Sequence, residues 1–131
     1  MAHVLDAHAL MVYLEKEPGY QKVQELLTHA ATSDRKLLLS TVNWGEVYYV
    51  TQRAYSPDKA QQIADVIKSF PIDVVDVDLE IAKQAALFKV AHKMSYADCF
   101  AAALAKTRKA TLMTGDKEFK PLDGEIRIAW L

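Results

Sequence analysis

Short runs of Val, Ile and Leu alternate along the chain with longer segments in which apolar residues recur every three or four positions. The short runs predict buried strands, and the longer spacing predicts amphipathic helices. We expect strands over residues 3–6, 36–42, 72–78, 110–114 and 126–131. We expect helices over residues 9–17, 19–32, 44–55, 57–70, 80–93 and 96–109. Strands that alternate with helices indicate an α/β sandwich around a mainly parallel sheet.

The length and composition of the chain fit a single globular domain, expected to span residues 1–131. We expect no secretory signal and no membrane span, because no apolar stretch approaches the roughly 18 residues that a span requires. Cys99 is the only cysteine, which fits a reducing cytoplasm. The net charge of −1 argues against a protein that coats polyanions. An enzyme that holds metal in a cluster of acids remains compatible with that charge.

Four carboxylates lie at strand ends or near the start of a following helix. Asp6 and Asp116 directly follow the first and fourth strands, and Glu46 lies four residues after the second. Asp98 lies at the front of the alanine-rich helix 96–109. In parallel α/β sheets, ligands bind outside the carboxyl ends of the strands. We therefore expect these four side chains to meet at one edge of the sheet.

Each acid taken alone has a second interpretation as a helix cap. Asp6 can cap the helix that follows it. Asn43 and Glu46 have the spacing of a capping box, with Glu46 reaching back to the Asn43 amide, and Ser95 and Asp98 share that spacing. Likewise, Asp116 beside a glycine is ordinary turn chemistry.

Taken together, the four acids favour a metal site. Converging carboxylates repel one another, and a buried unpaired charge costs several kcal/mol. A divalent cation relieves that repulsion, and hard oxygen ligands suit Mg²⁺ or Mn²⁺. Sites built from acids that hold such ions are typical of enzymes that hydrolyse phosphodiester bonds.

These motifs resemble the PIN domain, in particular the VapC-type toxins of bacterial and archaeal toxin–antitoxin pairs. The residues that carry the likeness are Asp6, Asn43-x-x-Glu46, Ser95-x-x-Asp98 and Thr114-Gly115-Asp116. The likeness covers essentially the whole chain. It implies a three-layer α/β/α sandwich and a ribonuclease that depends on Mg²⁺ or Mn²⁺. It also implies that Asp6, Glu46, Asp98 and Asp116 are the catalytic and metal-binding residues.

The resemblance also implies partners. We expect a cognate antitoxin that blocks the site, and paired carboxylates favour an inhibitory segment that bears Arg. A homodimer is expected as well. The alternative is a catalytically silent PIN-like module that binds RNA or a partner protein, and the presence of all four acids favours the enzyme. Receiver domains and Asp-x-Asp phosphatases need a second acid near Asp6, which this chain lacks, and no G-x-S-x-G elbow is present.

One position departs from the family pattern. His8 stands two residues after Asp6, where the family often has a hydroxyl residue. His8 contacts either the scissile phosphate or a metal-bound water, or else it is a partly buried helix residue that makes one hydrogen bond. We favour the second interpretation, because isolated histidines usually have structural roles.

Several other polar residues are candidates for weaker roles at the site. We expect Thr114 to hydrogen-bond an acid or a metal-bound water, and Ser95 and Asn43 to act first as helix caps. Lys117 either contacts an RNA phosphate or belongs to a solvated face.

The remaining candidates are assigned to surface or core. Tyr48, Tyr49 and Tyr55 either stack on RNA bases or form a protein–protein surface, which we favour. We expect Cys99 to pack as a small hydrophobe. The acids at positions 73, 76, 78 and 80 are assigned to solvent or to the start of a helix.

Overall fold

The computed structural model describes residues 2–131, which build a five-stranded sheet with the strand order β3-β2-β1-β4-β5. All of its strand pairs are parallel. The strands are β1 His3–Leu5, β2 Leu37–Ser40, β3 Ile72–Val75, β4 Thr111–Thr114 and β5 Arg127–Trp130. The expected α/β fold with a parallel sheet is confirmed, and each expected strand is found at somewhat shorter length.

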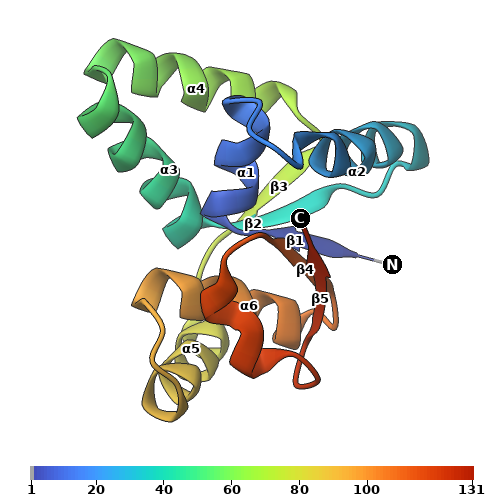
Figure 1. Cartoon of the computed structure of the whole chain (residues 1–131), viewed down its shortest axis with the longest axis vertical. Coiled ribbons are helices and arrows are strands. Elements are labelled where there is room, and N and C mark those ends of the chain that lie inside the picture. The colour runs from blue at the N-terminus through green and yellow to red at the C-terminus, as the bar shows by residue number, and fades with distance from the viewer. Residues whose placement is uncertain (1) are drawn as a thin grey trace.

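Helices cover both faces of this sheet. They are α1 Ala7–Leu14, α2 Tyr20–Ser33, α3 Thr41–Ala54, α4 Pro57–Ser69, α5 Leu79–Ala91 and α6 Tyr96–Thr107. Helices α1 to α4 lie on one side of the sheet and α5 and α6 on the other (Figure 1). Each side has its own apolar core, one centred on Leu10 and Val23, the other on Phe88 and Leu104. The layers are therefore α/β/α.

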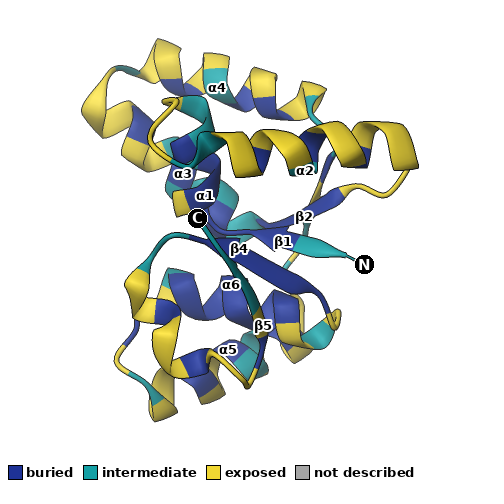
Figure 2. Cartoon of the chain, turned by 45° about the vertical axis from the view of Figure 1, so that its right-hand side comes forward, coloured by how far each residue is buried: buried dark blue, intermediate teal, exposed yellow. Residues whose placement is uncertain are grey.

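The short strands are buried because both faces of the sheet are covered. Strands β2 and β4 are buried at every position, and α6 is buried from Asp98 to Ala105, as the dark blue ribbon in Figure 2 shows. Alanines at 101, 102, 103 and 105 give α6 little side-chain bulk, so it lies directly against the sheet. Cys99 is fully buried there, as expected for a small hydrophobe.

Side chains at the helix starts fix where the helices begin. The N-caps that accept a backbone hydrogen bond are Asp6 of α1, Ser40 of α3, Ser56 of α4, Asp78 of α5 and Ser95 of α6. The expected cap roles of Asp6 and Ser95 are confirmed. Asp78 caps α5, while Asp73 within β3 is exposed beside Lys36, so these acids serve the helix start and solvent as expected.

The predicted capping role of Asn43 is wrong. Strand β2 ends at Ser40, because the Ser40 hydroxyl accepts a hydrogen bond from the Asn43 amide at 3.1 Å and starts α3 at Thr41. Asn43 therefore lies inside the helix. One element was not expected at all, the 3₁₀ helix η1 Lys117–Leu122, which Asp116 caps.

The order of the strands reverses at the centre of the sheet. The chain adds strands on one side of β1 up to β3, and then returns to the other side of β1 with β4. Ligand sites of open parallel sheets lie at such a reversal. Asp6 follows β1 and Asp116 follows β4, so these two acids flank it. Within residues 2–131, no helix is long and apolar enough to cross a membrane.

Candidate metal-binding active site

Asp6 forms the buried floor of the site. Its side chain is 1% exposed, and its Oδ1 accepts a hydrogen bond from the Ala9 amide at 2.7 Å. The Thr114 hydroxyl donates to Asp6 Oδ2 at 2.5 Å. Burial raises the pKa of the Asp6 carboxyl to about 6, although these two hydrogen bonds oppose the shift. Asp6 is thus a helix cap and also an acid with a raised pKa, located where the strand order of the sheet reverses.

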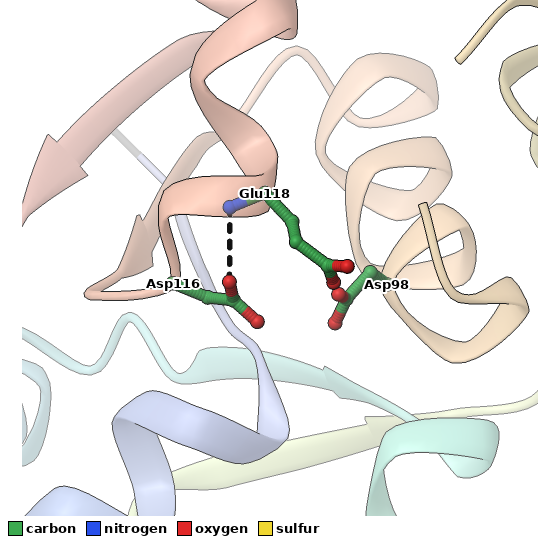
Figure 3. A group of neighbouring side chains, drawn as sticks. All are labelled: Asp98, Asp116 and Glu118. Carbon is green, nitrogen blue, oxygen red and sulfur yellow. Dashed lines mark hydrogen bonds between the residues drawn. The ribbon is translucent and has the colours of Figure 1, made fainter. Parts of the chain in front are cut away.

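Thr114 connects Asp6 to Asp116. The same hydroxyl that donates to Asp6 accepts a hydrogen bond from the Asp116 amide at 3.0 Å. Asp116 in turn accepts from the Glu118 amide at 2.9 Å through Oδ1 (Figure 3). The turn after β4 is therefore held by side chains, and it fixes the Asp116 carboxylate at the end of the strand.

Three carboxylates gather in front of this turn. Each of Asp98, Asp116 and Glu118 offers an oxygen that lies within 4.8 Å of the other two. Figure 3 shows the side chains of Asp98 and Glu118 pointing toward each other from α6 and η1, with Asp116 beside them. The pKa of Asp98 is raised, first by burial, then by a hydrogen bond with the Glu118 side chain and by the charge of Asp116. A hydrogen bond with the Ser95 side chain opposes that shift.

Glu46 approaches the cluster from α3. Burial raises the pKa of Glu46, and the charge of Asp116 adds to the shift. Asn43 stands one helical turn earlier and is fully buried. Its Nδ2 donates to the Ala97 carbonyl oxygen at 3.1 Å and reaches Glu46 Oε1 at 3.5 Å. Asn43 therefore joins α3 to α6 and orients Glu46 beside the helix that carries Asp98.

One pocket of about 240 Å³ brings most of these groups together. Glu46, Asp98 and Asp116 line it, with His8 and Val50 among its other walls. A larger hollow of about 610 Å³ lies at the other end of β4 and β5, and none of the four predicted acids lines it. The chemistry therefore marks the smaller pocket as the site.

His8 is exposed on α1 and makes no hydrogen bond to any residue of the described range 2–131. The interpretation of His8 as a partly buried, hydrogen-bonded helix residue is therefore wrong. Its ring lies against Gly115, where an added Cβ would come within 2.8 Å of His8 Cε1. The absence of a side chain at Gly115 thus makes room for His8 at the mouth of the pocket. Lys117 is also exposed, at the start of η1.

The sequence interpretation missed Glu118. Its position two residues after Asp116 was visible in the sequence. If the chain after Asp116 were an extended or irregular loop, however, the Glu118 side chain would point away from Asp98. Only the 3₁₀ turn capped by Asp116 brings it to the cluster. An acid two residues after the Gly115-Asp116 pair at the strand end was the available signal.

The donor set fits a hard divalent cation. The converging ligands are carboxylate oxygens, which Mg²⁺ and Mn²⁺ prefer. Burial and like charge raise the pKa values of Asp6, Glu46 and Asp98, so the bare site disfavours its own negative charge. A bound cation would remove that penalty. Asp98, Asp116 and Glu118 are the residues closest to a shared ligand position.

Comparison with known proteins decides the family. The sequence profile of the PIN domain matches residues 3–125. The chain belongs to the PIN domain family. In sequence, no curated protein matches the chain significantly.

Solved structures of the same fold come from toxin–antitoxin pairs. VapBC2 from Rickettsia felis, bound to a DNA fragment from its promoter, has a TM-score of 0.79 at 19% identity, over 100% of this chain and 99% of that one. DNA-bound VapBC from Salmonella typhimurium has a TM-score of 0.79 at 18% identity, over 98% and 97% of the two chains. VapC20 from Mycobacterium tuberculosis, described as a toxin that cleaves the sarcin–ricin loop, has a TM-score of 0.73 at 15% identity, over 93% and 95%. The predicted resemblance to a VapC-type PIN domain is confirmed at the level of family and fold.

Proposed function

We propose that this PIN-domain protein is a divalent-metal-dependent endoribonuclease and the toxin of a type II toxin–antitoxin pair. The observation that carries the proposal is the approach of Glu46, Asp98 and Asp116 to one pocket, above Asp6 at the switch of the sheet. The PIN family match and the VapC-like fold support the same reading. Residues 1–131 are proposed to form one nuclease domain.

Asp98, Asp116 and Glu118 would hold Mg²⁺ or Mn²⁺, with Glu46 and Asp6 completing the acidic site. When bound, such a cation lowers the pKa of water and neutralises charge on a phosphodiester. The chain's own residues do the positioning. Thr114 holds Asp6 and the turn that carries Asp116, and the buried Asn43 orients Glu46.

His8 and Lys117 are proposed to contact the RNA. Both are exposed at the mouth of the acidic pocket or beside it, and both carry N–H donors that suit phosphate oxygens. Ser95 caps α6 and hydrogen-bonds Asp98, so it steadies the acid rather than the substrate.

A cognate antitoxin is the proposed protein partner. The neighbours from Rickettsia felis and Salmonella typhimurium are described as VapBC assemblies on DNA, which supports a partner of the same kind here. A basic segment with an Arg would match the paired carboxylates, because its planar fork bonds them bidentately. We further propose a homodimer and an action on RNA in the cytoplasm.

The alternative is a PIN module that binds RNA or a partner without cutting. The raised pKa of Asp98, together with the ligand position that it shares with Asp116 and Glu118, favours catalysis, because a passive surface has no use for like charges gathered around a buried acid.

The test is incubation of purified, antitoxin-free protein with total cellular RNA, with Mn²⁺ or Mg²⁺ and with EDTA. Cleavage that requires the metal and is lost in Glu46→Gln supports the proposal. Intact RNA with folded protein at millimolar Mn²⁺ would favour the silent module.

A further inference from the structure

The face of α3 that carries Glu46 continues beyond the acidic pocket. Tyr49, Val50 and Arg53 follow Glu46 at spacings of three, four and seven residues, so all four lie on one side of the helix. A rise of 1.5 Å per residue places Arg53 about 10 Å along the axis from Glu46. Glu46 and Val50 line the acidic pocket together, so this face begins inside the proposed active site and leads out of it.

Tyr49 and Arg53 form a cation–aromatic pair on this face. The Arg53 guanidinium lies 4.9 Å from the centroid of the Tyr49 ring. Tyr49 is 48% exposed, and within residues 2–131 its hydroxyl has no hydrogen-bond partner. The two side chains line a hollow of about 300 Å³ with Tyr48 and Gln52. A planar, partly polar platform is therefore open to solvent on the helix that carries Glu46.

Two nearby tyrosines, Tyr48 on α3 and Tyr55 directly after it, make contacts with other parts of the molecule. Tyr48 stacks on Trp44 with ring centroids 5.4 Å apart, and its hydroxyl reaches Gln61 on α4. The Tyr55 hydroxyl donates to Glu15 near the end of α1. Tyr48 and Tyr55 therefore make contacts that stabilise the fold. Within the described part of the chain, no such contact explains why Tyr49 points outward.

We propose that Tyr49 and Arg53 form a subsite for single-stranded RNA next to the acidic pocket. A base stacks on the Tyr49 ring or on the outer plane of the Arg53 guanidinium, and Arg53 contacts the phosphate on that side of the scissile bond. Aromatic rings and guanidinium planes are the usual platforms for unpaired bases. This inference rests on the proposed ribonuclease function, and it adds a contact point for the RNA strand outside the acidic pocket.

A protein partner is the competing occupant of this surface. The largest exposed apolar side chains favour another place for such a partner, since Leu79, Leu87 and Val90 all project from α5 with exposures of 54–89%. The α3 platform instead combines a cation with an aromatic ring, and it lies on the helix whose Glu46 and Val50 line the acidic pocket. RNA is therefore the occupant that its chemistry fits.

The test uses the full chain and a fluorescently labelled single-stranded RNA pool of random sequence, with binding followed by anisotropy in EDTA to prevent cleavage. Tyr49→Ala should weaken binding roughly tenfold, the loss expected for one stacked base. Tyr49→Phe, which keeps the ring, should bind within about twofold of the parent protein, an estimate that follows from the same stacking term. Arg53→Gln should weaken binding and reduce its salt dependence by about one phosphate contact.

Two matched variants control for surface changes elsewhere. Tyr55→Ala removes an exposed tyrosine directly after the same helix, and Arg35→Gln removes an exposed arginine before β2. Both should bind RNA as the parent does. Melting temperatures of the Tyr49, Arg53 and Arg35 variants should match that of the parent, because these side chains are at the surface, whereas Tyr55→Ala loses the bond to Glu15 and should melt slightly lower.

The outcomes separate this inference from the proposed function. Metal-dependent cleavage by the parent, with unchanged binding by Tyr49→Ala, overturns the subsite and leaves the nuclease standing. Binding that depends on Tyr49 in a protein that never cuts RNA supports the subsite and rejects the nuclease. A parent dimer that becomes a monomer in Tyr49→Ala, with RNA binding unchanged, assigns the surface to a second copy and overturns the proposal.

Discussion

The Thr114 hydroxyl donates to Asp6 Oδ2 at 2.5 Å and so joins the ends of β1 and β4. These strands are neighbours in the sheet, but their ends stand 108 residues apart in the chain. The bond crosses the point at which the strand order reverses. Because the same hydroxyl accepts from the Asp116 amide, one side chain positions two of the four acids.

Thr114→Val should therefore destabilise the protein and reduce RNA cleavage together. Valine has nearly the same shape, but it leaves Asp6 Oδ2 and the Asp116 amide without this partner, which costs about 1–3 kcal/mol for a buried polar group. Urea unfolding and a cleavage assay measure the two effects. Thr114→Ser keeps the hydroxyl and should retain most of both. If the valine variant matched the serine variant in cleavage, Thr114 would have no positioning role.

Mn²⁺ should raise the melting temperature in a saturable way. The ion binds the folded acid cluster and finds no preformed site in the unfolded chain, so 100-fold excess over Kd adds about 2.7 kcal/mol. Glu118→Gln should shift saturation to higher Mn²⁺, whereas Glu80→Gln, at an exposed acid of α5, should not. Differential scanning fluorimetry in EDTA and in millimolar Mn²⁺, at equal ionic strength, checks this. Identical melting curves would count against an acidic metal site.

Asp98→Asn should abolish cleavage without destabilising the metal-free protein. Ser95 already caps α6, and losing one charge from the group Asp98, Asp116 and Glu118 relieves repulsion. Stability in EDTA should be equal or higher, whereas a plain helix-dipole role would cost roughly 0.3–1 kcal/mol. Cleavage should fall by orders of magnitude.

Asp58→Asn provides the control for this substitution. Asp58 is a first-turn acid of α4 outside the site, so its replacement should lower stability slightly and leave cleavage unchanged. A destabilised Asp98→Asn protein that cuts RNA at the parent rate would return Asp98 to a capping role.

The metal-free protein should lose stability as the pH rises from about 4 to about 6. The pKa of Asp6 is raised from 3.8 to about 6 by burial, so over this range the unfolded chain releases a proton that the folded protein keeps. The free energy of unfolding then falls with pH, for Asp6 by an amount on the order of 3 kcal/mol. The raised pKa of Asp98 extends the fall to higher pH.

Asp6→Asn isolates that contribution, because asparagine also caps helices well. Its free energy of unfolding in EDTA should fall less between pH 4 and pH 6 than that of the parent. Urea titrations at several pH values measure the difference. Parallel pH profiles for the two proteins would refute the assignment to Asp6.

An Arg-bearing antitoxin segment should depend on the acids for binding. Replacing Asp6, Glu46, Asp98 and Asp116 with their amides removes the charges that a guanidinium would pair with. Isothermal titration with the proposed antitoxin should show a large loss of affinity. Equal affinity for both proteins would mean that inhibition occurs elsewhere.

The sequence pattern was enough to predict the five strands and six helices. Short aliphatic runs mark the strands, and apolar residues spaced three or four apart mark the helices. The parallel sheet and the strand-end placement of Asp6 and Asp116 followed from the alternation of these elements. The family was expected because the acidic motifs, in their order along the α/β frame, resemble the PIN domain.

Tertiary structure decided what the one-dimensional pattern left open. Ser40 ended β2 two residues early and moved Asn43 into the helix, where its amide reaches Ala97 of α6. A 3₁₀ turn brought Glu118 to Asp98, and Gly115 made space for His8. These outcomes depend on contacts between segments that are distant in sequence, or on the backbone geometry of a single turn. The periodicity of a sequence indicates which side of a helix or strand a residue lies on. The residue that it contacts there is determined only when the helices pack against the sheet.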